Sequence, residues 1–193
     1  MINKTDYLFV ASDIRHYTHT VNTNSHAQKM LFLAPIHVII YGFDLGSSSF
    51  HSFVASIAAL KTMKRRDFGN FQHKVFPYQF LTQSIAPGLL AITAPYALTP
   101  VGISLLATSS IGGLLNLLWA RPKCDEIKRK RNFIIDNVYG GDDDKGLESD
   151  DCKPLNKEFM KYHKWSLFFN MVSIVSITAY SWVLSNGFYS LKK

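Results

Sequence analysis

Three ionisable side chains recur at a fixed spacing inside an apolar stretch of the sequence. His37, Asp44 and His51 are seven residues apart, and Tyr41 and Ser48 lie between them. In a helix this spacing places all five side chains on one stripe. The stripe could carry a proton or a small solute, or it could be a packed, hydrogen-bonded seam. The two histidines could also hold haem, although no other apolar stretch carries a matching pair.

The element that positions this stripe is membrane-spanning by composition. Four apolar stretches each reach the roughly 20 residues needed to cross a hydrocarbon core of ~30 Å, and Asp44 is their only formal charge. An acid near the bilayer centre costs at least ~2.5 kcal/mol unless it is neutral or paired. We therefore expect Asp44 to face the bundle interior, neutral or hydrogen-bonded in a seam with Ser48, Asn116 or Asn170. The predicted spans are about 31–60, 76–95, 101–120 and 165–188.

The predicted fold is all-α. It is an integral membrane bundle of four transmembrane helices over residues 30–190, preceded by an interfacial amphipathic helix within residues 1–29. A soluble all-α domain is the less favoured alternative, since buried soluble helices are usually shorter and amphipathic. Five small residues are predicted to allow close helix approach: Gly42, Gly46, Ser109, Gly112 and Gly113.

The polar loop 121–164 divides into two parts. Its first part should be a helix along the headgroups, supported by the pairs Asp125–Arg129 and Glu126–Lys130 and by an apolar face of Ile127, Ile134 and Val138. Residues 140–154 are rich in glycine and acid, which predicts a mobile, solvated loop. Cys124 and Cys152 are expected to be free thiols, with a disulfide or a zinc site as the alternatives.

The basic residues indicate an orientation. Sixteen Lys and Arg residues lie in loops 61–75 and 121–164, and five lie on the other side of the predicted spans. The positive-inside rule then places both loops in the cytosol and both termini across the membrane. We expect an intracellular membrane, of the endoplasmic reticulum or the mitochondrion. The run "KRKRN" (128–132) could contact nucleic acid, but a juxtamembrane anchor explains the same residues and is favoured, so no nucleic-acid partner is predicted.

Other candidate chemistry is weak. Three histidines near the N-terminus could bind a metal, namely His16, His19 and His26, but no acidic or cysteine residues accompany them as further metal ligands. There is no G-x-S-x-G motif, carboxylate pair or phosphate loop in a suitable scaffold. A lipid enzyme would require His163, Tyr162 and Asp44 to meet. We therefore predict no enzyme, no cofactor and no metal.

Three segments together resemble the transmembrane protein 205 family. They are "FGNFQHKVFPYQF" (68–80), "NLLWARP" (116–122) and "FMKYHKWSLFFN" (159–170). The resemblance implies a four-span fold, with links to drug tolerance and trafficking rather than to a defined reaction. Pro77 is interpreted as a helix start, Lys74 as a headgroup contact, and Asn116 and Asn170 as hydrogen bonds across helices. The matching residues are Lys74, Pro77, Asn116, Trp119, Pro122, Tyr162, His163 and Asn170.

The leading functional hypothesis is a structural, interaction or membrane-organising helix bundle whose partners are the lipid bilayer and other membrane proteins. The alternative is a transporter-like bundle that moves protons or a small solute along His37, Asp44 and His51. A hydrated cavity at Asp44 would favour transport, whereas close packing around Asp44 would favour the structural role.

Overall fold

The computed structural model describes residues 32–191, and every regular element in this range is a helix. The predicted helix within residues 1–29 lies outside the described residues. Residues 32–62 form the first helix, which contains the π-helical turn η1. The elements are residues 32–50, η1 (His51–Ala55), α2 (Ser56–Thr62), α3 (Arg65–Thr93), α4 (Pro100–Leu115), η2 (Asn116–Ala120), α5 (Arg121–Val138), α6 (Asp143–Glu148) and α7 (Lys153–Ser190).

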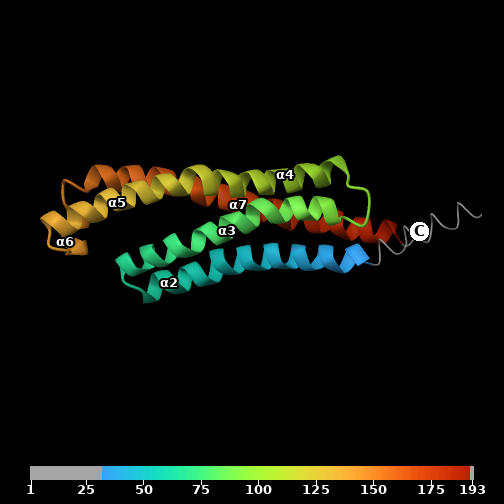
Figure 1. Ribbon diagram of the computed structural model, residues 1–193, viewed down its shortest axis with the longest axis horizontal. Coiled ribbons are helices and arrows are strands. Elements are labelled where there is room, and N and C mark those ends of the chain that lie inside the picture. The colour runs from blue at the N-terminus through green and yellow to red at the C-terminus, as the bar shows by residue number, and fades with distance from the viewer. Residues whose placement is uncertain (1–31, 192–193) are drawn as a thin grey trace, which may run out of the picture.

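Residues 32–62, α3, the rod of α4, η2 and α5, and α7 make four long helical segments. These segments lie side by side (Figure 1). The turn between α2 and α3 and the tip formed by α6 are at one end, and the connection between α3 and α4 is at the other. The segments α4, η2 and α5 form one continuous rod, and α4 packs against both α3 and α7. Beyond the α2–α3 turn, α5 and α7 continue as a pair that carries α6. We call residues 121–164 the extension.

Two rods are long and apolar enough to cross a membrane, Pro100–Val138 and Lys153–Ser190. At about 1.5 Å per residue, their 39 and 38 residues measure roughly 58 and 57 Å, about twice a hydrocarbon core of ~30 Å. Part of each rod would therefore project from a bilayer. The first helix and α3 do not reach the same hydropathy in the described part of the chain, because they carry most of the buried polar side chains.

The distribution of polarity is inverted relative to a soluble bundle. Large apolar side chains are exposed along all four long segments, whereas the interior holds histidine, aspartate, glutamine, asparagine and serine. An apolar cluster of Leu90, Leu106, Ile177 and Tyr180 is buried beside these polar residues. An apolar exterior of this extent is a surface that water does not favour. The exposed residues include Ile39, Phe43, Leu81, Ile85, Ile111, Leu118, Phe168 and Val175.

Close helix approach occurs at three of the five predicted small residues. A Cβ on Gly112 would lie 2.9 Å from the Phe169 carbonyl oxygen, and one on Gly113 would lie 2.8 Å from backbone atoms of α3. The Ser109 and Ser173 hydroxyls each donate to the other's carbonyl oxygen, at 3.2 and 2.8 Å. The prediction was wrong for Gly42 and Gly46, which are exposed and would have no neighbouring atom within 4 Å of an added Cβ.

Two predicted helix boundaries were also wrong. Pro77 is inside α3, which begins twelve residues earlier at Arg65. Likewise α7 begins at Lys153 rather than near 165. The sequence interpretation equated helix ends with membrane boundaries, but polar residues outside a bilayer can continue a helix when they pack against a neighbour.

The predicted mobile loop 140–154 is packed. Asp142 caps α6 by accepting a hydrogen bond from the Lys145 amide at 3.1 Å. Leu147 and Cys152 are buried against Ile135 of α5. The composition argument overlooked that one leucine and a helix cap can anchor a short polar segment to a neighbouring helix.

The predicted helix in the first part of the loop exists as α5, but its details differ. Glu126 pairs with Lys130 as expected, at 2.8 Å. Asp125 pairs instead with Arg121 and His73, at 3.4 and 2.8 Å. Ile135 is buried while Val138 is exposed. The helix faces α7 and continues the line of α4 (Figure 1), and its position along the headgroups stays a prediction.

Candidate functional site

The predicted polar stripe lies inside the bundle. His37, Asp44 and His51 are 0%, 1% and 8% exposed, and Ser48 is buried with them. Side chains from α3 and α7 extend this stripe into a polar seam along the bundle. We call the seam the group His37, Asp44, Ser48, His51, Gln72, Gln79, Gln83, Asn170 and Tyr180.

At one end of the seam, His37 is held in a single tautomer. The Thr93 hydroxyl donates to the Leu89 carbonyl at 2.7 Å, so the contact of 3.1 Å between Thr93 and His37 requires His37 Nδ1 to donate. In the neutral imidazole His37 Nε2 then accepts, and the Tyr180 hydroxyl lies 3.2 Å away. Tyr96 is 3.1 Å from Tyr180 and completes the cluster. Both ring nitrogens of His37 therefore have hydrogen-bond partners.

In the middle, hydrogen bonds join three helices. Ser48 accepts from the amide groups of Gln79 and Gln83, at 2.9 and 3.3 Å. Gln83 also donates to Asn170 at 2.8 Å, and Asn170 donates to Ser52 at 2.9 Å. The network connects the first helix, α3 and α7 at a level where each helix exposes apolar residues on its other side.

The other end of the seam lies beside the π-helical turn that starts at His51. The Ser56 hydroxyl is 3.3 Å from His51 Nε2 and accepts from Gln72 at 3.0 Å. The His51 ring meets Phe76 edge-on, with ring centroids 5.5 Å apart. An extra residue in the helical turn changes the direction of the side chains that follow it, so η1 sets how His51 and Ser56 face α3.

Asp44 stands between these clusters without a partner. Neither of its carboxyl oxygens has a hydrogen-bond partner among the described residues. Gln83 Oε1 is also buried and also lacks a hydrogen-bond partner among these residues. Ser48, one turn away, is close enough to interact with the carboxyl group but not in hydrogen-bond geometry. The predicted bonds to Asn116 and Asn170 are not formed, because these side chains donate to the Ser166 carbonyl and to Ser52. A buried carboxylate without donors is strongly disfavoured, so the arrangement suits the neutral acid.

The remaining residues of the resemblance lie toward the extension. Asn116 donates to the Ser166 carbonyl at 3.1 Å, which confirms a hydrogen bond across helices. Trp119 meets Tyr162 edge-on at 5.6 Å, and His163 stacks on Phe159 at 5.6 Å. Lys74 is exposed, and Pro122 is in the first turn of α5, directly after the π-helical turn η2.

The structure does not bring together His163, Tyr162 and Asp44, the three residues that a lipid enzyme would require. On α7, Asn170 contacts Ser52 and Tyr180 contacts His37, so Asp44 lies between these two levels. His163 is two turns beyond Asn170, toward the extension. Tyr162 and His163 therefore pack in an aromatic cluster remote from Asp44.

Sequence reasoning missed the contribution of α3. Gln72, Gln79 and Gln83 are spaced seven and four residues apart, which places them on one helix face opposite the stripe. This spacing was a usable signal. It was hidden because the predicted span starts at residue 76, which leaves Gln72 in a loop.

Ion pairs attach the extension to the bundle. Arg66 at the start of α3 contacts Asp136 at 2.6 Å and Asp143 at 3.0 Å. The hydrogen bond with Asp136 is the largest cause that raises the pKa of Arg66. Lys128 donates to Asn70 at 3.0 Å. The extension is therefore held to α3 as well as to α7.

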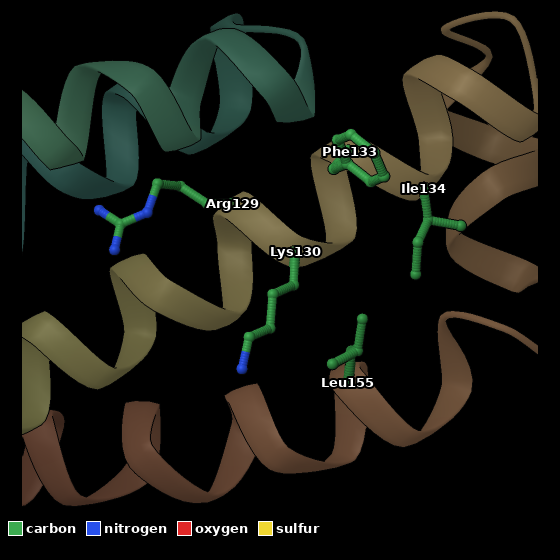
Figure 2. Close-up of a pocket in the computed structure, with 5 residues that line it drawn as sticks. All are labelled: Arg129, Lys130, Phe133, Ile134 and Leu155. Atoms are coloured by element: carbon green, nitrogen blue, oxygen red, sulfur yellow. The ribbon is translucent and has the colours of Figure 1, made fainter.

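A shallow hollow of about 590 Å³ opens on the extension between α5 and α7. Figure 2 shows Lys130 and Ile134 reaching from α5 toward Leu155 on α7. Arg129 and the largely exposed Phe133 complete its lining. A second hollow, of about 690 Å³, lies along α7 between Lys157 and Phe168.

Comparisons with known proteins identify a matching family model and a similar fungal protein. Residues 39–132 match a domain of unknown function, DUF4149, from within the first helix into α5. The chain is 27% identical over 162 residues to the xanthocillin biosynthesis cluster protein D of Aspergillus fumigatus, covering 80% of this chain and 90% of that protein. No solved structure matches.

Proposed function

We propose that the chain is a four-span membrane protein, similar to the transmembrane protein 205 family, with a structural or membrane-organising role. The observation that carries the proposal is the pairing of an apolar exterior with a buried polar seam, in which Asp44 is 1% exposed. In a bilayer, hydrogen bonds between helices hold a bundle together where the hydrophobic effect does not. We assign the chain no catalytic reaction and no nucleic-acid partner.

The proposed orientation places the extension in the cytosol and the α3–α4 connection on the opposite side of an intracellular membrane. The excess of Lys and Arg at the extension end supports this orientation. The extension then presents Phe133 and Val138, which are 69% and 64% exposed, to cytosolic or membrane-bound proteins. Exposed apolar side chains outside the bilayer are suited to protein contacts.

Native electrophoresis of the full chain, extracted from its own membrane in a mild detergent, tests the organising role. We expect a complex larger than the monomer that dissociates in Phe133→Ser/Val138→Ser and persists in Asp44→Asn. Phe43→Ser is the matched control, since Phe43 is equally exposed but lies on the first helix. A monomer in every case would contradict the proposal.

One observation favours a second candidate, the movement of a proton or small solute. Both carboxyl oxygens of Asp44 lack partners although the polar groups around it form hydrogen bonds. An amide cannot exchange a proton, so transport would be abolished in Asp44→Asn while folding is preserved. Full rescue of a cell lacking the protein by Asp44→Asn would exclude this candidate.

A further inference from the structure

The face of α7 between Lys157 and Phe168 combines charge with aromatic surface. Lys157, Lys161 and Lys164 are exposed and line the hollow of about 690 Å³ together with Met160, Trp165 and Phe168. Five of these residues follow one another at intervals of four, three, one and three positions: Lys157, Lys161, Lys164, Trp165 and Phe168. These intervals keep the five side chains on one side of the helix. The hollow is therefore basic at one end and aromatic at the other.

The positive charge on this face is not neutralised by the protein. None of the three lysines takes part in an ion pair within residues 32–191. Glu158 is the one acidic residue in this stretch of α7, and it interacts electrostatically with Lys130 of α5. By contrast, the lysines at 123, 130, 145 and 153 each contact a carboxylate.

The hollow also lies where a bilayer surface is expected. Trp165 and Phe168 are about half exposed at the start of the apolar part of α7, and the lysines precede them on the side of the extension. From Lys157 to Phe168 the helix rises about 16 Å, enough to pass from the headgroups into the acyl chains. Tryptophan favours this boundary, and lysine stems can lie along apolar surface while their ammonium groups reach phosphates.

We propose that this face binds an anionic phospholipid of the leaflet on the extension side. The lysine ammonium groups would contact its phosphate and headgroup carboxylate, and an acyl chain would lie on Trp165 and Phe168. The inference rests on the proposed membrane placement of α7 and names one lipid class that the bundle would gather around itself. Each engaged lysine should favour an anionic lipid on the order of fivefold.

Quenching of Trp165 fluorescence by lipids with brominated acyl chains tests the proposal. The full chain with Trp119→Phe and Trp182→Phe is reconstituted in phosphatidylcholine vesicles containing a minor fraction of either brominated phosphatidylserine or brominated phosphatidylcholine. We expect brominated phosphatidylserine to quench Trp165 several-fold more strongly. The difference should disappear in Lys157→Gln/Lys161→Gln/Lys164→Gln and persist in Lys123→Gln/Lys145→Gln/Lys153→Gln, which loses the same charge from ion-paired positions.

Each outcome has one meaning. Equal quenching by the two brominated lipids would overturn the proposal while leaving α7 in the bilayer. Loss of the difference on adding inorganic phosphate would indicate a phosphate site rather than a lipid site, and would also overturn it. Absence of quenching by either lipid would contradict the membrane placement itself, and therefore the proposed function. Circular dichroism of the two triple variants checks that both retain their helices.

Discussion

Gln83 donates its side-chain amide to Asn170 at 2.8 Å, and these residues are 87 positions apart in the chain. The same amide nitrogen lies 3.3 Å from Ser48 on the first helix. One glutamine of α3 therefore connects the first and last helices through the middle of the bundle.

Removing this glutamine should weaken the bundle. We expect Gln83→Leu to lower the free energy of unfolding in detergent by about 0.5–2 kcal/mol, the range for hydrogen bonds between membrane helices. The control is Thr82→Ala, because the Thr82 hydroxyl donates to the Tyr78 carbonyl of its own helix. Equal stability of the two variants would show that the hydrogen bonds of Gln83 do not hold the helices together.

Alanine substitution should have opposite effects at two glycines, because Gly113 lies in a close helix contact and Gly46 is exposed. Gly113→Ala should destabilise the bundle by about 1–3 kcal/mol through overpacking, because its Cβ would lie 2.8 Å from backbone atoms of α3. Gly46→Ala should be neutral or stabilise by up to about 1 kcal/mol, because alanine favours the helix and nothing lies within 4 Å of its Cβ. Thermal unfolding in detergent measures both, and the reverse order would contradict the packing.

The sequence anticipated the helical class and the buried stripe for identifiable reasons. The seven-residue spacing of His37, Asp44 and His51 fixes a helix face, and the cost of a charge in hydrocarbon turns that face inward. The partners of the stripe could not be derived in the same way. They depend on which α3 and α7 residues lie at the same level, and one helix's periodicity does not report the vertical offset of its neighbours. Helix ends were missed because the prediction ended each helix where its apolar stretch ended, whereas α3 and α7 extend into polar sequence.

The tip of the extension should lose order when its single leucine is shortened. Leu147 is 8% exposed and packs with Ile135 and Cys152. Leu147→Ala should cost about 2 kcal/mol or more of local stability. Faster hydrogen exchange of the amides of α6 would report this loss, with Lys145→Ala as the exposed control on the same helix. Unchanged exchange in Leu147→Ala would mean that α6 is not anchored by this contact.

Alkylation of Cys124 should depend steeply on pH. Burial, with a smaller effect of Asp125, raises the pKa of the Cys124 thiol to about 12. At pH 8 roughly one in ten thousand Cys124 side chains would then be in the thiolate form. For a thiol with the usual pKa of ~8.5, about a quarter would be. In Cys152→Ala, the alkylation rate of Cys124 by iodoacetamide should rise about tenfold per pH unit up to about pH 11. A plateau near pH 9 would contradict this environment. The control is an exposed cysteine introduced by Lys145→Cys.

The most direct test of the closed seam is the access of water to position 44. Asp44→Cys is placed in a chain with Cys124→Ala and Cys152→Ala, reconstituted in vesicles permeabilised to a charged, membrane-impermeant thiol reagent. Lys145→Cys in the same background reports the reactivity of an exposed thiol. We predict that the thiol at position 44 remains unmodified in the folded protein and reacts fully after denaturation in detergent. Modification of position 44 in the folded protein at a rate approaching that of position 145 would show a hydrated path to the seam and contradict the structural role.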